Sequence, residues 1–278
     1  MVVMSEVTDL RFFESSDGAL AYRDTGGAGL PVVLLHAGFV DHTMWDEQIP
    51  VLAKEFRVIA PDARGHGRSA NASRPFRQDD DLAELLRHLG VGPAALVGVS
   101  MGAMIAVATA LEHPELVRAL VVSGGGADER EFTDPWAGQA QRAAFQALAA
   151  GDIEAWHEVS DLWVHGRERP REAVRPEVYA RLRAMRQRTI GKHAPGEPDH
   201  HVRVRDLAAR AARITVPVLA LNGAQDAPEL RAMADSVADA APRGRTAVIE
   251  DAAHFPNLDH PEEYTRTVAA FLHEVDRP

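Results

Sequence analysis

Short runs of apolar residues alternate with amphipathic segments along most of the chain. Runs of strand length that lack polar positions indicate strands buried on both faces. The expected strands are 10–14, 19–23, 31–35, 56–60, 94–99, 117–122, 216–221 and 246–249. The expected helices are 43–55, 79–89, 101–112, 176–188, 228–240 and 260–275. This alternation predicts an α/β fold, a doubly wound and mostly parallel sheet with helices on both faces.

The alternation stops between Asp128 and Arg213. This segment holds three of the chain's four tryptophans, at positions 136, 156 and 163, and an Arg-rich helical stretch. The strand-and-helix rhythm resumes after it, so we interpret residues 128–213 as a helical cap inserted into one core. Residues 1–127 and 214–278 form that core in this prediction.

Composition narrows the possible functions. The formal net charge of −11 argues against a nucleic-acid surface, which requires a basic face. The absence of cysteine excludes disulfides, thiolate catalysis and Cys-ligated metals. No secretory signal and no apolar run long enough for a membrane span are found, so a cytoplasmic protein is expected. The pattern calls for no cofactor and no metal, and we expect a monomer or homodimer that binds a small molecule.

A Gly-x-Ser-x-Gly sequence, 98–102, lies between the strand 94–99 and the helix 101–112. A strand that turns at once into a helix leaves no room for a Cβ at its flanks, which explains the two glycines. The strained turn exposes the Ser100 hydroxyl, and the helix start directs free N–H groups toward it. The context therefore predicts that Ser100 is a nucleophile.

A serine nucleophile requires a base and an acid that orients the base. Asp226 follows the strand 216–221, and His254 follows the strand 246–249, so both occupy the edge where catalytic groups of parallel sheets gather. Asp251 and Asp128 are the alternative acids. The paired His200 and His201 have no carboxylate spacing that would indicate a metal site.

With these residues in place, the chain resembles the α/β-hydrolase superfamily over nearly its full length. The matching motifs are His36-Ala37-Gly38, the turn at Ser100, Gly223-x-x-Asp226 and His254, and Arg64-Gly65-His66-Gly67-Arg68-Ser69 is similar to a stretch common in that family. The resemblance implies that Ser100 is the nucleophile, His254 the base and Asp226 its orienting acid. It also implies an oxyanion hole formed by the Met101 N–H and one from the His36 loop, Gly38 first and Phe39 as the alternative. His36, Asp62, Arg64 and His66 are then loop supports.

The expected reaction is hydrolysis of a carboxylic ester or lactone through an acyl-Ser100 intermediate. Met101-x-x-Met104-Ile105 and Met44-Trp45 are similar to enol-lactone hydrolases, which favours a lactone. Alternatives are a C–C bond hydrolase of a vinylogous diketone, a cofactor-free haloperoxidase and a non-catalytic receptor. Phe39, Trp136, Trp156 and Trp163 are the candidate walls of the substrate pocket.

Overall fold

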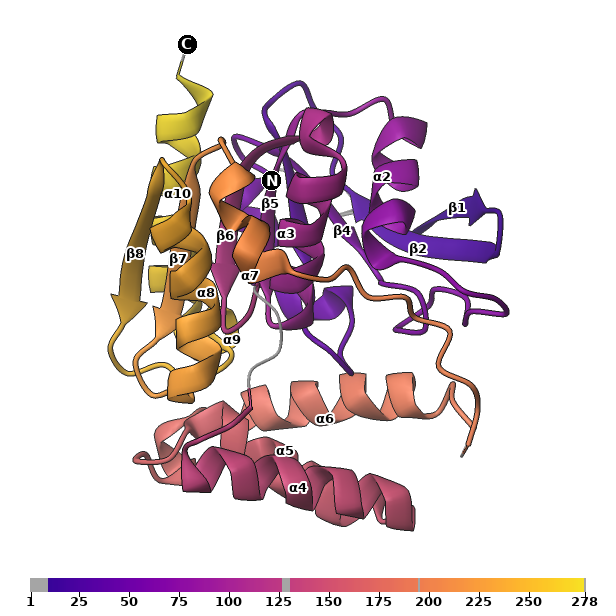
Figure 1. Ribbon diagram of the computed structural model, residues 1–278, viewed down its shortest axis with the longest axis vertical. Helices are drawn as coiled ribbons and strands as arrows, with labels where there is room; N and C mark the ends of the chain where they lie inside the picture. The colour runs from indigo at the N-terminus through magenta and orange to yellow at the C-terminus, as the bar shows by residue number, and fades with distance from the viewer. Residues whose placement is uncertain (1–9, 127–130, 195, 278) are drawn as a thin grey trace, which may run out of the picture.

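The computed structural model describes residues 10–126, 131–194 and 196–277, and Figure 1 shows their arrangement. The strands are β1 (Arg11–Ser15), β2 (Gly18–Asp24), β3 (Pro31–Leu35), β4 (Arg57–Pro61), β5 (Ala94–Val99), β6 (Val117–Ser123), β7 (Val218–Gly223) and β8 (Gly244–Ile249). The helices are α1 (Ile49–Leu52), α2 (Gln78–His88), α3 (Met101–Glu112), α4 (Pro135–Ala150), α5 (Ile153–His165), α6 (Pro176–Ile190), α7 (Leu207–Arg210), α8 (Pro228–Ala240), α9 (Pro256–Asp259) and α10 (Pro261–Asp276). Short 3₁₀ turns occupy His42–Trp45, Pro114–Leu116, Arg171–Ala173 and Ala211–Arg213.

The strands form an eight-stranded sheet in the order β1-β2-β4-β3-β5-β6-β7-β8. The opening hairpin pairs β1 with β2 and then β2 with β4 in antiparallel fashion, and the remaining neighbours are parallel. The predicted α/β fold with a mostly parallel sheet is confirmed. Parallel pairing brings the carboxyl ends of β5, β7 and β8 to the same edge of the sheet.

Side chains of each central strand alternate between two apolar layers, as the period of a strand requires. On β3, Val33 and Leu35 pack into the layer covered by α2, α3 and α8. Val32 and Leu34 pack into the other layer, beneath α1 and α10. Burial on both faces explains why these strands show no polar alternation in the sequence.

Helices α4, α5 and α6 lie together beyond the carboxyl ends of the parallel strands (Figure 1). They come from the segment that the sequence analysis assigned to a cap. The last part of that segment packs on the sheet domain and not with α4, α5 and α6, because Leu207 and Ala211 belong to the same apolar layer as α3. The division into a cap, 128–213, and a core, 1–127 and 214–278, stays a prediction, and the first boundary falls among residues that the structure does not describe.

The prediction of one continuous helix over 43–55 was wrong. The structure has a 3₁₀ turn at His42–Trp45 and a separate short helix, α1, with Pro50 in its first turn. Proline lacks an N–H, and its ring collides with the carbonyl four residues earlier, so a helix cannot run through this position. The apolar periodicity reported the buried face correctly, since Trp45, Ile49 and Leu52 are all buried.

Among the described residues, no helix is both long enough and apolar enough to span a membrane.

Candidate active site

Ser100 lies in the tight turn between β5 and α3. Its backbone has φ +55° and ψ −116°, a conformation that residues other than glycine rarely adopt. The glycines at 98 and 102 permit this turn: a Cβ on Gly98 would collide with the Gly102 backbone, and one on Gly102 with the Leu35 carbonyl. Ser100 therefore occupies a strained position at the N-terminus of α3, where the first N–H groups have no partner within the helix.

His254 and Asp226 are joined by a hydrogen bond. His254 Nδ1 lies 2.9 Å from Asp226 Oδ2, and both side chains are nearly buried. The other carboxylate oxygen of Asp226 accepts the Ala227 amide at 2.8 Å. His254 is also held by its main chain, because its amide donates to the Trp163 carbonyl of α5 at 3.2 Å. The alternative acid Asp251 is exposed and contacts Arg169 and His260 through its carbonyl, whereas Asp128 lies outside the described residues.

The loop after β6 packs against this pair. A Cβ on Gly124, which has φ +57°, would lie 2.8 Å from His254 Nδ1 and 2.9 Å from Asp226 Oδ2. Asn222 fixes the loop, since its Oδ1 accepts the Gly124 amide at 2.9 Å. A Cβ on Gly125 would lie 2.6 Å from the Ser100 carbonyl oxygen. The loop thus fits closely against the His–Asp pair and the Ser100 turn at once.

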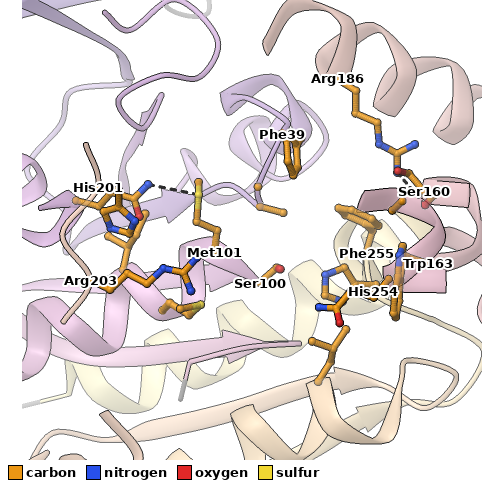
Figure 2. Close-up of a pocket in the computed structure, with 18 of the residues that line it drawn as sticks. Phe39, Ser100, Met101, Ser160, Trp163, Arg186, His201, Arg203, His254 and Phe255 are labelled. Carbon is orange, nitrogen blue, oxygen red and sulfur yellow. Dashed lines mark hydrogen bonds between the residues drawn. The ribbon is translucent and has the colours of Figure 1, made fainter. Parts of the chain in front are cut away.

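Ser100 and His254 open onto the same pocket, a cavity of about 470 Å³ between the sheet edge and helices α4, α5 and α6. Figure 2 shows the Ser100 hydroxyl between Met101 on one side and His254 on the other. No hydrogen bond links Ser100 to His254 among the described residues, and such bonds commonly tighten only when substrate is bound. The structure therefore brings Ser100, Asp226 and His254 together at one site.

Backbone amides converge beside Ser100. The Met101 N–H starts α3, and Gly38 lies against Met101, with a Cβ at Gly38 placed 3.9 Å from the Met101 Cβ. The neighbouring Phe39 has φ +63°, so the chain turns sharply at this point. In the described structure neither the Gly38 nor the Phe39 amide donates a hydrogen bond to another backbone carbonyl. The choice between them as the second oxyanion donor stays a prediction.

Three of the four predicted wall residues line the pocket: Phe39, Trp156 and Trp163. Phe39 is 46% exposed and packs edge-on against Trp156, with ring centroids 5.1 Å apart. Trp136 lies behind this wall, because its ring packs against that of Trp163 at 5.4 Å and does not line the cavity. The tryptophans of the cap thus form two layers, of which one faces the pocket.

The sequence analysis missed several pocket residues. Arg186 of α6 lines the cavity although its side chain is buried, and it donates to Asp161 at 2.8 Å and to the Ser160 carbonyl at 3.1 Å. Burial lowers the pKa of its guanidinium, and Asp161 opposes that shift. Asp161 also binds Arg171 at 2.7 Å, so a single carboxylate serves two guanidinium groups. Nothing in the local pattern of the Arg-rich helix distinguishes Arg186 from its exposed neighbours.

His201 also lines the pocket, a position that its polar surroundings in the sequence did not predict. Its ring packs on Phe76 with centroids 5.5 Å apart, and burial lowers its pKa. The backbone around it pairs with Phe76, whose carbonyl accepts the Val202 amide at 2.8 Å. The segment that follows the cap is therefore tied to the core beside the pocket.

The other polar loop residues that the resemblance identified as loop supports form hydrogen bonds within or between loops, or to α2. His36 Nε2 accepts the Ala63 amide at 2.9 Å, and burial lowers the pKa of His36, which favours its neutral form. Arg64 binds Asp81 through two hydrogen bonds of 2.7 and 2.8 Å. Burial lowers the pKa of His66 to about 3, so His66 is neutral near pH 7.

Two groups of acidic and histidine side chains lie close enough for a metal ion in the described part of the chain: Asp41, His42 and Asp62, and Asp79, Asp80 and His113. In the first group the carboxylates already accept hydrogen bonds from Arg188, Thr43 and His42. In the second, Arg77 binds Asp79 at 2.7 Å. These groups act as hydrogen-bond networks, and we assign a metal to neither.

Comparison with known proteins agrees with the observed fold. The family described as alpha/beta hydrolase fold matches residues 31–261. The (E)-2-((N-methylformamido)methylene)succinate hydrolase of Acinetobacter baylyi is 30% identical over 92% of this chain and 95% of its own. The 3-oxoadipate enol-lactonase 2 of the same organism is 26% identical over 93% and 94%. A thermophilic esterase from Thermogutta terrifontis, solved with malate bound, has a TM-score of 0.77 and 27% identity and covers 97% of this chain and 100% of its own. The chain belongs to the α/β-hydrolase family and is a hydrolase.

Proposed function

We propose that this hydrolase cleaves a carboxylic ester or lactone through an acyl-Ser100 intermediate. The observation that carries the proposal is the convergence at one pocket of a serine on a strained turn and a buried His254–Asp226 pair. Each of these groups follows a different strand, so their meeting depends on the whole sheet and not on one local motif.

The roles follow from the positions. Asp226 accepts a hydrogen bond from His254 Nδ1 and so leaves Nε2 as the nitrogen that takes the Ser100 proton. Ser100 Oγ attacks the substrate carbonyl, and the oxyanion that forms is stabilised by the Met101 N–H and by that of Gly38 or Phe39. His254 then returns the proton to the leaving alcohol. A water molecule, deprotonated by His254, releases the acid from Ser100.

The relatives support both branches of the proposal. One is named as an enol-lactonase and a structural neighbour is named as an esterase, and each matches nearly the whole chain. A chain of this family with a serine at the turn is suited to acyl transfer to water. The cytoplasmic location, the absence of a cofactor and the monomeric or homodimeric state stay predictions from the sequence.

The test is the release of p-nitrophenol from short-chain p-nitrophenyl esters by the wild type and by Ser100→Ala. Loss of the serine is expected to lower kcat by a factor on the order of 10⁶. Circular dichroism of the variant provides the control for folding. Equal rates for the two proteins would show that Ser100 is not the nucleophile.

A second candidate, hydrolysis of a C–C bond in a vinylogous diketone, is favoured by one observation. Arg186 lines the pocket wall with its guanidinium paired to Asp161, and we propose that it also binds a carboxylate of such a substrate. Cleavage of a vinylogous diketone with no turnover of any ester or lactone would favour this candidate over the first.

A further inference from the structure

One face of α3 lines the pocket along two helical turns. Met101, Met104, Ile105 and Ala108 all contact the cavity, and their spacing of three, four and seven residues places them on one side of the helix. With a rise of 1.5 Å per residue, this stripe extends about 10 Å from the first residue after Ser100. The cavity is therefore longer on this side than the reaction at Ser100 requires.

Aliphatic side chains also face this arm: Val204 and Leu207 from the segment 200–207, and Leu230 of α8. The polar side chains of His201 and Arg203 line the pocket on the Met101 side as well (Figure 2). Leu207 is only 2% exposed and belongs to the same apolar layer as the α3 stripe, so this side of the arm is anchored in the core. We call the space between the α3 stripe and Val204, Leu207 and Leu230 the aliphatic arm.

The other side of Ser100 is aromatic. The His254 ring lies against those of Trp163 and Phe255, with centroid separations of 6.3 and 5.1 Å. Figure 2 shows these rings on one side of the Ser100 hydroxyl and Met101 on the other. The aromatic rings therefore gather on the His254 side of Ser100, and the α3 stripe lies on the Met101 side together with His201 and Arg203.

The proton transfer determines which part of an ester occupies which side of Ser100. His254 must deliver its proton to the leaving alcohol, so the alcohol group lies on the His254 side. The acyl group extends in the other direction, toward Met101 and along α3. This step rests on the proposed function, because it uses the acyl-Ser100 intermediate.

We propose that the aliphatic arm binds the alkyl chain of the acyl group and makes this hydrolase selective for esters or lactones of medium-chain aliphatic acids. Unbranched alkyl chains fit an elongated wall of Met, Ile, Val and Leu side chains, and each buried methylene group adds apolar contact. The methyl group of Ala108, near the far end of the stripe, leaves the space that the end of the chain occupies.

The first experiment compares two isomeric esters, ethyl octanoate and octyl acetate, which have the same atoms and differ in which side of Ser100 receives the long chain. Hydrolysis is followed by acid release, and kcat/KM is expected to be at least about tenfold higher for ethyl octanoate. A p-nitrophenyl series from acetate to octanoate is expected to gain about threefold in kcat/KM for each added methylene group. A preference for octyl acetate, or for p-nitrophenyl acetate over the octanoate, would overturn the assignment.

The second experiment shortens the arm. Ala108→Leu is expected to lower kcat/KM for p-nitrophenyl octanoate about tenfold or more and to leave that for the acetate near the wild-type value. The matched control is Ala110→Leu: Ala110 is on the same helix and is 7% exposed, against 6% for Ala108, but it does not line the pocket. If both variants fail to fold, Met104→Trp fills the arm from a half-buried position. An unchanged octanoate-to-acetate ratio in a folded arm variant would overturn the proposal.

Failure of this proposal differs from failure of the proposed function. Turnover that depends on Ser100 but is fastest with acetate removes the aliphatic arm and keeps the acyl-enzyme. Turnover that persists in Ser100→Ala, or no turnover of any ester or lactone by the folded wild type, removes the acyl-enzyme itself and the arm's assigned ligand with it.

Discussion

In the part of the chain that the structure describes, two buried pairs of histidine and aspartate have nearly the same geometry. His254 Nδ1 lies 2.9 Å from Asp226 Oδ2, and His42 Nδ1 lies 2.7 Å from Asp62 Oδ1. Their surroundings differ. Asp62 also accepts the amides of His42 and Arg68, at 2.8 and 2.7 Å, and neither member of this pair lines the pocket that holds Ser100.

A His–Asp hydrogen bond alone therefore does not identify a catalytic pair. The pair at His42 ties the 36–45 loop to the 61–69 loop, and its carboxylate is satisfied by main-chain donors. The pair at His254 shares a cavity with a serine on a strained turn. Access to a nucleophile and to substrate separates the two roles.

The largest expected difference is in turnover. Asp226→Asn should lower kcat by about 10⁴, because an amide that donates to Nδ1 holds the imidazole in the wrong tautomer. The matched change in the other pair, Asp62→Asn, is expected to leave kcat near that of the wild type when the folded fraction is equal. Ester hydrolysis assays on the two variants check this, and comparable losses in both would show that the pairs are not functionally distinct.

The loss of unfolding free energy should be larger for the Asp62 variant than for the Asp226 variant, the reverse of the order expected for kcat. Asp62→Ala removes a carboxylate that holds two loops and leaves buried donors without a partner, so it is expected to cost about 3 kcal/mol in free energy of unfolding. Asp226→Ala leaves fewer such donors, since the carboxylate of Asp226 accepts only the Ala227 amide besides His254 in the described structure. Urea denaturation of both variants measures the difference. A smaller loss for Asp62→Ala than for Asp226→Ala would contradict the structural role of the His42 pair.

A smaller effect is expected from Gly124→Ala. The added Cβ would approach both His254 and Asp226, and φ at this position is positive, so the pair must shift. A displacement of this kind is expected to lower kcat about tenfold to a hundredfold with a loss of stability of about 1 kcal/mol. The matched control is Gly151→Ala, because Gly151 also has positive φ but has no atom within 4 Å of a Cβ. An equal loss of kcat in both variants would contradict the close fit at Gly124.

The smallest expected effect is a dependence of the unfolding free energy on pH in the acidic range. Burial alone would raise the pKa of Asp62, but the hydrogen bonds that it accepts from His42 and from the Arg68 amide hold that pKa below the ordinary value. A carboxyl with a lowered pKa in the folded state stabilises the protein above the unfolded-state pKa, and this stabilisation is lost as pH falls through the folded-state pKa. The difference in unfolding free energy between wild type and Asp62→Asn should therefore shrink below about pH 4. A difference that stays constant or grows in acid would be inconsistent with this pair.

The sequence predicted the strands and a mostly parallel sheet, because strands buried on both faces leave a clear apolar pattern. It also placed Ser100, Asp226 and His254 on loops after strands, and parallel pairing brings such loops to one edge. Pro50 could have predicted the break between the 3₁₀ turn and α1, but the apolar periodicity of 43–55 favoured one continuous helix. Arg186 and His201 could not be predicted, because their burial depends on contacts with segments far away along the chain. Periodicity reports that a face is buried and does not report what covers it.

Activation of Ser100 by the His254–Asp226 pair would leave an acyl group on the serine during turnover. Mass spectrometry of the wild type, quenched in acid during turnover of p-nitrophenyl octanoate, measures this acyl group. We expect an added octanoyl group on the peptide that contains Ser100, and none on that peptide in Ser100→Ala or in Asp226→Asn at the same time point. An octanoyl group on a different residue during turnover, or the same labelling of Ser100 in Asp226→Asn, would contradict activation of Ser100 by this pair.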